Sequence, residues 1–173
     1  PGDIRFKDLN HDGKLDDNDK TFIGNAFPDL MVGINARLAW KNIDFAANFY
    51  GTIGNDVYNT TKGRYSGVSG ENVYAGTYNA SWHGEGTSYD LPRLSYNDAN
   101  QNWTRVSSFY VEDGSYLRCK QLQIGYTLPK KWTKKISLRL SFSAQNPFTI
   151  TGYSGMDPEA AALGTEGKVT ESG

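Results

Sequence analysis

Four segments of this chain alternate apolar and polar residues with a period of two, and this pattern limits the possible folds more than any other feature. The segments extend from about Asp29 to Trp40, Ile43 to Thr52, Ser115 to Leu128 and Ile136 to Ala144. Successive side chains of a β-strand point to opposite faces, so each segment is predicted to be a strand with one apolar and one polar face. We therefore expect an all-β fold.

The connections between these segments are of two kinds. Lys41-Asn42 and the basic stretch from Pro129 to Lys135 are short, which predicts antiparallel hairpins. Residues 53–114 and 146–173 are long, polar connections. A loop of ~60 residues is unusual inside a compact soluble domain. Short turns at one end and long loops at the other are typical of outer-membrane β-barrels.

Two architectures fit an alternating pattern: a transmembrane barrel wall and a soluble β-sandwich. The polar faces mix small and uncharged residues with few charges, which favours a water-filled lumen. Trp40, Tyr126 and Trp132 fall near the short turns, as aromatic residues do at a membrane interface. Four strands cannot close a barrel, so the remaining strands would come from another part of the same protein.

In the barrel, the apolar face of each strand meets lipid and the polar face meets the lumen. The residues expected to face lipid are Leu38, Phe45, Leu122, Ile124, Leu138 and Leu140, and those expected to face the lumen are Arg37, Asn48, Gln123 and Arg139. Arg118 and Lys120 fall in the apolar register of the third segment. Either a β-bulge shifts the register there, or this half of the strand stands above the lipid.

The composition of the chain excludes few classes of protein but is compatible with a β-barrel. The 18 Lys and Arg nearly balance the 19 Asp and Glu, which gives no reason to expect nucleic acid as a partner. The chain contains no run of ~18 apolar residues, so no transmembrane helix is predicted. Cys119 is the only cysteine, so no disulfide can form within the chain.

The sharpest local motif lies between Asp8 and Asp19. Oxygen-bearing side chains fall at positions 1, 3, 5, 9 and 12 of this stretch, and Gly13 falls at position 6, which is the spacing of an EF-hand calcium loop. The predicted calcium ligands are Asp8, Asn10, Asp12, Lys14 through its carbonyl, Asp16 and Asp19. No amphipathic helices flank the loop, so a structural calcium ion is expected rather than a switch; the alternative is an acidic surface turn.

The sequence contains no combination of residues that predicts catalysis. His83 is one of two histidines, and no nucleophile is placed beside it by spacing. The long loop is instead rich in aromatic residues, whose flat rings suit sugar or peptide contacts. The candidates for substrate binding are Tyr65, Tyr74, Trp82 and Trp103. The alternative is that these rings stabilise the loop itself.

Several stretches resemble the SusC/RagA-type TonB-dependent outer-membrane transporters. They are Gly2 to Asp8 with the acidic loop and Ile23 to Asn25, Phe109 to Lys120, Leu122 to Pro129, Ala144 to Thr151 and Tyr153 to Glu159. These stretches occur in the family's order and span most of the chain. Cys119 and Pro147 stand where an apolar residue, commonly Leu, is expected, and Val68 to Gln101 resembles the family least.

The resemblance implies a plugged antiparallel transmembrane barrel of about 22 strands, of which about four lie here. It also implies a Gram-negative outer membrane, energy from the TonB complex, a SusD-like surface lipoprotein, and import of glycans or peptides. The expected regions are an extracellular calcium-type loop (1–28), transmembrane hairpins (29–53 and 115–147), a long extracellular loop (54–114) and a final extracellular loop (148–173) before a closing strand. The competing hypothesis is a soluble, calcium-stabilised β-sandwich that binds carbohydrate.

Overall fold

The computed structural model describes residues 1–64, 72–73, 75–134 and 136–163. The chain divides into two compact units. One, here called the loop unit, contains Pro1–Gly24 and Tyr58–Glu112; the other, the sheet unit, contains Asn25–Val57 and Asp113–Gly173.

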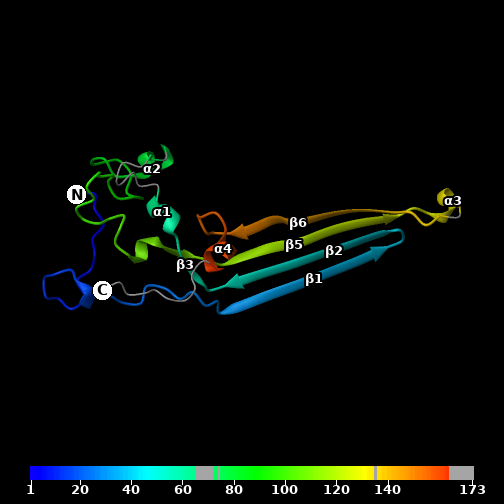
Figure 1. Ribbon diagram of the computed structural model, residues 1–173, viewed down its shortest axis with the longest axis horizontal. Coiled ribbons are helices and arrows are strands. Elements are labelled where there is room, and N and C mark those ends of the chain that lie inside the picture. The colour runs from blue at the N-terminus through cyan, green and yellow to red at the C-terminus, as the bar shows by residue number, and fades with distance from the viewer. Residues whose placement is uncertain (65–71, 74, 135, 164–173) are drawn as a thin grey trace. The chain divides into compact units, whose positions relative to one another are not determined.

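The sheet unit is built on four long antiparallel strands in the order β1-β2-β5-β6 (Figure 1). The strands are β1 (Leu30–Trp40), β2 (Ile43–Ile53), β5 (Tyr116–Thr127) and β6 (Arg139–Thr151). The bounds predicted for the first three agree with the structure to within one residue at each end. Alternation of apolar and polar side chains was therefore a sufficient signal for these strands.

The fourth strand differs from its prediction at both ends. β6 begins at Arg139 rather than Ile136 and continues to Thr151, beyond the predicted end at Ala144 and beyond the boundary expected at 147. Pro147 cannot donate a backbone hydrogen bond, which is unfavourable inside a sheet. It lies opposite an interruption of the β5–β6 ladder, and Asn146 takes a positive φ of 47° there. Because the ladder is already interrupted, the missing donor costs little and the strand continues.

Short turns join both hairpins, as the sequence predicts. Lys41 has a φ of 54° in the two-residue turn between β1 and β2, where such turns require a positive value. The β5–β6 connection contains the short helix α3 (Lys130–Thr133) (Figure 1).

The register places apolar residues in rows on one face of the sheet and polar residues in rows on the other. Leu38, Phe45, Ile124 and Phe142 lie opposite one another across the four strands. The adjacent row on the other face consists of Arg37, Ala46, Gln123 and Ser143. The sheet therefore has an apolar face and a polar face over its whole width.

A β-bulge resolves the irregular half of β5. The register shifts between Cys119 and Gln121, so Lys120 is the extra residue relative to β2. The shift keeps both Cys119 and Leu122 on the apolar face, although residues three positions apart lie on opposite faces of a regular strand. Arg118 lies across from Tyr50 and Thr149 on the polar face. Of the two explanations considered from sequence, the structure shows the bulge.

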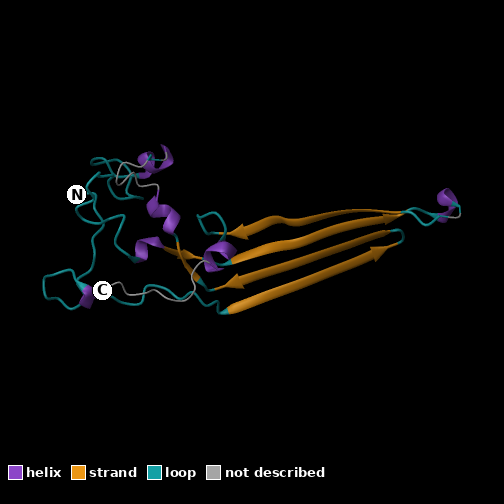
Figure 2. Cartoon of the chain, viewed as in Figure 1, coloured by secondary structure: helices purple, strands orange, loops and turns teal. Residues whose placement is uncertain are grey.

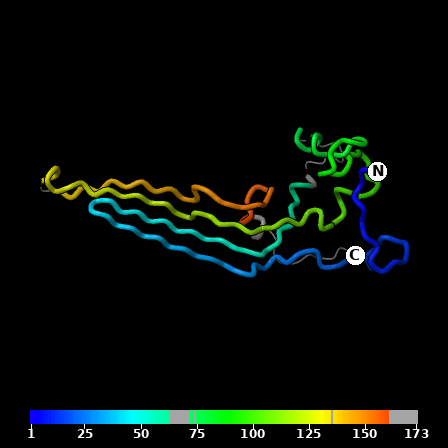
Figure 3. The backbone as a smooth tube through the Cα atoms, turned by 180° about the vertical axis from the view of Figure 1, so that it is seen from behind, coloured from blue at the N-terminus to red at the C-terminus, as the bar shows by residue number. Residues whose placement is uncertain are grey.

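The four strands lie side by side in a single layer, as views from both sides show (Figures 2 and 3). Leu38 is 68% exposed and Phe142 65% exposed on the apolar face. A sandwich would bury Leu138 and Leu140 under a second sheet, but they are 45% and 60% exposed. No helix in the described part of the chain has the length and apolar character needed to cross a membrane.

Small residues on β5 let side chains from β2 and β6 meet above it. On the polar face, Arg139 donates to Asp44 at 2.5 Å, and a side chain at Gly125 would collide with both groups. On the apolar face, the rings of Phe49 and Phe148 are 6.3 Å apart, on either side of Cys119. These contacts tie strands that are not hydrogen-bonded neighbours.

The remaining elements are short. They are the 3-10 helices η1 (Asp17–Asp19) and η3 (Ser108–Tyr110), the helices α1 (Thr60–Arg64), α2 (Ala75–Ala80) and α4 (Pro158–Leu163), and a two-stranded sheet of β3 (Asp56–Tyr58) and β4 (Val111–Asp113). The long connection is therefore not a structureless loop. Its helices are too short for a periodic apolar pattern to reveal them.

Hydrogen bonds to two buried polar residues organise the interior of the loop unit. Asp98 accepts from the backbone N–H groups of Asn102 and Trp103, both at 2.9 Å. The Asn102 carboxamide accepts from the N–H of Ile4 at 2.8 Å and donates to Asp3 at 2.7 Å. Asp98 and Asn102 are 6% and 1% exposed. Polar contacts thus join the start of the chain to residues about a hundred positions later.

Candidate functional site

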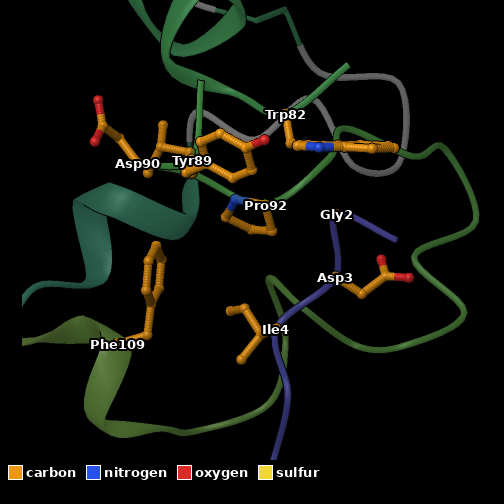
Figure 4. A pocket seen from close by; sticks show the side chains of 9 residues that line it. Gly2, Asp3, Ile4, Trp82, Tyr89, Asp90, Pro92 and Phe109 are labelled. Carbon is orange, nitrogen blue, oxygen red and sulfur yellow. The ribbon is translucent and has the colours of Figure 1, made fainter. Parts of the chain in front are cut away.

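The loop unit contains a pocket of about 320 Å³ lined mainly by aromatic and apolar residues (Figure 4). Its lining residues are Gly2, Asp3, Ile4, Trp82, Tyr89, Asp90, Leu91, Pro92 and Phe109. Figure 4 shows the Trp82 ring above Gly2, with Tyr89 and Pro92 beside it and Phe109 at the opposite wall. Flat apolar surfaces with a few polar groups are typical of small-ligand sites.

Backbone hydrogen bonds hold the walls of this pocket in place. The N–H of Trp82 donates to the carbonyl of Leu91 at 3.0 Å, and the N–H of Leu91 donates to that of Ala80 at 3.0 Å. The N–H of Arg93 donates to the carbonyl of Gly2 at 2.8 Å. Gly2 has a φ of 82°, and a side chain there would collide with the Trp82 ring. Only glycine allows the chain to pass so close beneath the indole.

The two carboxylates of the pocket have different surroundings. Asp3 accepts from the Nε of Arg93 at 2.7 Å and from Asn102 at 2.7 Å. Burial alone would raise the pKa of Asp3, but the hydrogen bonds from Arg93 and Asn102 outweigh it and lower the pKa below its usual value. Asp3 therefore holds the pocket wall together, while Asp90 is exposed and its carboxylate points away from the pocket (Figure 4).

The four predicted substrate-binding aromatics have different outcomes. Trp82 lines the pocket. Trp103 is only 7% exposed, and its ring donates to the carbonyl of Arg93 at 3.4 Å. Its indole fills the interior of the loop unit, so in this conformation it offers no ring face to a substrate. Tyr65 and Tyr74 lie outside the described residues.

Sequence reasoning did not single out the other main pocket residues. Tyr89 and Phe109 line the pocket with Trp82, although Tyr89 and Phe109 are 20 positions apart along the chain. Tyr89 was one of many aromatic residues in the loop, and nothing in its neighbours marked it. Only the bridge between Ser81 and Leu91 brings Trp82 and Pro92 together.

The acidic loop between Asp8 and Asp19 is folded by its own side chains. Asp8 accepts from the N–H groups of His11 at 2.7 Å and Gly13 at 2.9 Å. Asp12 accepts from the N–H of Lys14 at 2.8 Å. Gly13 has a φ of 79°, the sharp turn that position 6 of the motif requires.

The last predicted ligand closes this loop. Asp19 accepts from the N–H of Leu9 at 2.7 Å and from that of Asp16 at 3.0 Å. Backbone hydrogen bonds from Asp16 and Leu9 lower the pKa of Asp19. Among the described residues, no three acidic, His or Cys side chains converge closely enough to hold a metal ion. The carboxylates are directed at backbone amides, but each carboxylate has about four acceptor sites, so these contacts leave oxygen lone pairs for a cation.

The sheet unit defines the class of the protein. A single antiparallel layer with one exposed apolar face and one polar face has the pattern of the wall of a large transmembrane β-barrel. No family model matches the chain.

Comparison with known proteins identifies the family. The chain is 37% identical over 163 residues to TonB-dependent receptor P3 of Formosa agariphila, covering 92% of this chain and 16% of that protein. It is 25% identical over 163 residues to the TonB-dependent receptor SusC of Bacteroides thetaiotaomicron, again covering 92% and 16%. The chain thus spans about a sixth of the length of these relatives.

Solved structures agree with the sequence relatives. The chain superposes on the RagAB peptide importer in its open-open state with a TM-score of 0.59 and 26% identity, covering 78% of this chain and 15% of that one. A second structure of the RagAB peptide transporter gives a TM-score of 0.62 and 25% identity, with the same coverage. The chain belongs to the SusC/RagA-type TonB-dependent transporters, of which it matches one segment.

Proposed function

We propose that this chain forms part of the barrel wall and outer loops of a transporter that imports glycans or peptides across a Gram-negative outer membrane. The observation that carries the proposal is the single-layered sheet, whose apolar face is exposed across four strands. The family further suggests a SusD-like surface lipoprotein as partner and TonB as the energy source, acting through parts of the protein outside this chain. Deletion of the transporter should abolish growth on the imported nutrient, and re-expression should restore it.

The proposal fixes which end of the sheet faces the cell surface. The β1–β2 turn and α3 would face the periplasm, and the loop unit would face outward. Membrane-impermeant thiol labelling of intact cells tests this with Lys131→Cys in α3 and Tyr96→Cys, which replaces a side chain that is 74% exposed in the loop unit. Labelling is expected at position 96 and not at position 131. Labelling at position 131 alone would contradict the orientation.

We further propose that the Trp82 pocket contacts the transported substrate. The indole provides a stacking face, and the Tyr89 hydroxyl provides a group that can hydrogen-bond a substrate hydroxyl or amide. Trp82→Ala should raise the substrate concentration for half-maximal uptake roughly tenfold, as loss of a central aromatic contact does. Trp132→Ala is the matched control, because Trp132 is 71% exposed in α3 and does not line the pocket. Equal uptake by both variants would contradict a role of the pocket in substrate binding.

The acidic loop is proposed to hold a structural calcium ion. Asp8, Asn10, Asp12, Asp16 and Asp19, with the Lys14 carbonyl, supply hard oxygen ligands in the motif's order. Calcium that binds only the folded loop would stabilise it by mass action. Titration calorimetry of the full transporter should show calcium uptake that Asp12→Ala abolishes. Asp17→Ala is the control, because Asp17 occupies a non-ligand position and is exposed. Identical titrations of all three proteins would refute the site.

A further inference from the structure

The segment Tyr153–Glu159, here called the strap, follows β6 and returns to the polar face of the sheet. Arg118 of β5 donates from Nη2 to Asp157 Oδ1 and from Nη1 to Glu159 Oε2, both at 2.6 Å. Lys120 Nζ donates to the two oxygens of Glu159 at 2.7 and 2.8 Å. Two cations of one strand therefore hold two carboxylates of the strap, in a group of four residues here called the latch.

The Arg118 end of the latch is built into the sheet. Its Nε donates to Thr149 Oγ1 of β6 at 2.8 Å, and its side chain is only 10% exposed. All three nitrogen groups of the guanidinium are thus engaged, two of them by the strap. Charge-assisted hydrogen bonds of this length are about twice as strong as neutral ones. They also gain strength where water is partly excluded.

The bulge in β5 supplies the second cation. Lys120 is the extra residue of the bulge, so it adds a charge to the polar face without moving Leu122 or Ile124 from the apolar face. A bulge interrupts the ladder and is usually retained where it directs a side chain. Here that side chain is directed to Glu159.

The strap has local structure of its own. Asp157 accepts from the N–H of Glu159 at 2.9 Å, and Pro158 is buried. The N–H of Tyr153 donates to Thr151 Oγ1 at 3.1 Å, and the Tyr153 ring occupies the space that a side chain at Gly155 would fill. The strap is therefore a compact segment fixed at both ends, not an open connection.

In a barrel, the polar face of the sheet lines the lumen. We propose that the latch holds the strap against the lumenal wall at the long-connection end of β5 and β6, where it narrows the passage, and that opening the latch widens it. The inference rests on the proposed transport role. The latch would regulate the passage of any solute that is large enough to require the wider opening.

Hydrogen–deuterium exchange on the purified full transporter tests the latch itself. Glu159→Gln removes the charge that both cations contact, and Asp44→Asn is the matched control, because it breaks the Arg139 ion pair on the same face away from the strap. Exchange in residues 153–159 should quicken roughly tenfold in Glu159→Gln, since one charge-assisted hydrogen bond is worth that much in an equilibrium constant. It should be unchanged in Asp44→Asn. Arg118→Gln should reproduce the strap variant, and equal exchange in all proteins would overturn the latch.

Thiol labelling of intact cells tests the passage. Gln145→Cys places a thiol on the exposed polar face of β6, and the native Cys119 is fully buried. A small charged methanethiosulfonate should label position 145 equally with and without Glu159→Gln. A maleimide carrying a polyethylene glycol chain should label faster only when the latch is broken, and equal rates would overturn the narrowing. If the wild-type protein is absent from the outer-membrane fraction, the proposed function fails, while the exchange experiment still decides the latch.

Discussion

The sheet unit and the loop unit are stabilised by different kinds of hydrogen bond. In the sheet unit, backbone groups pair in three antiparallel ladders, and the side chains need only match the face on which they lie. In the loop unit, buried carboxylate and carboxamide groups of residues such as Asp98 and Asn102 bond backbone groups directly. Many sequences can therefore form the sheet, whereas the loop unit depends on particular residues.

The difference has a consequence for tolerance to substitution. A ladder bond survives any side-chain change that respects the apolar or polar face. Replacing a buried side chain that accepts two backbone hydrogen bonds always lowers stability, because its loss leaves buried donors unsatisfied. An added charge should therefore destabilise the sheet on its apolar face only. In the loop unit, removal of one buried carboxylate should be enough to destabilise the fold.

The largest effect is expected for Phe142→Arg on the apolar face of β6. Phe142 is 65% exposed and is the fourth of the 13 residues of β6, in the apolar row with Leu38, Phe45 and Ile124. An arginine on a lipid-facing strand costs up to roughly 2–4 kcal/mol at the midplane and less toward the interfaces, so the amount of folded barrel recovered from outer membranes should fall. Ser143→Arg places the same charge on the polar face and should assemble close to wild type. Heat-modifiability in gel electrophoresis measures the folded fraction, and equal loss in both variants would contradict the assignment of faces.

A smaller and local effect is expected for Asp98→Ala in the loop unit. It leaves the buried N–H groups of Asn102 and Trp103 without their acceptor, and each buried unsatisfied donor costs about 1–3 kcal/mol. Hydrogen exchange should quicken in residues 95–110 and not in β1, β2, β5 or β6. The control is Asp90→Ala, since Asp90 is exposed. Faster exchange throughout the sheet would show that the two units do not unfold independently.

The smallest effect is expected for Cys119→Ala on β5. The thiol is fully buried between Phe49 and Phe148, and its loss removes one heavy atom from the apolar face. The cost should be about 1 kcal/mol, close to that of one buried methylene, which denaturant unfolding of the folded barrel can detect. In the wild-type protein, a small maleimide should react with Cys119 only after unfolding. Rapid reaction of the folded protein would show that the two rings do not cover the thiol.

Burial raises the pKa of Tyr110 in the loop unit, with added contributions from Tyr58 and Asp98. The Tyr110 hydroxyl donates to the carbonyl of Asn102 at 2.8 Å. The loop unit therefore keeps this proton, and with it the hydrogen bond, above the pH at which an exposed tyrosine ionises.

The sequence by itself determined the existence of the four strands, the bounds of three of them, most of their faces and the two hairpins. A period of two is imposed by strand geometry, so the apolar-face set with Leu38 and Phe45 and the polar-face set with Gln123 and Arg139 followed from local spacing alone. The acidic loop was equally legible, because its turn at Gly13 and its side-chain hydrogen bonds lie within a dozen residues. In both regions the groups that interact are close together in the chain or repeat regularly along it.

Only the tertiary structure decided the rest. The choice of a bulge at Lys120, the extension of β6 past Pro147 and the return of the strap to Arg118 all depend on partners about 30 to 70 positions away. The pocket likewise joins Gly2, Trp82 and Phe109, and the burial of Trp103 depends on contacts with Arg93. These features arise from long-range contacts between single residues, which leave no periodic pattern in the sequence. The strands, by contrast, arise from an alternation that recurs every two residues along each segment.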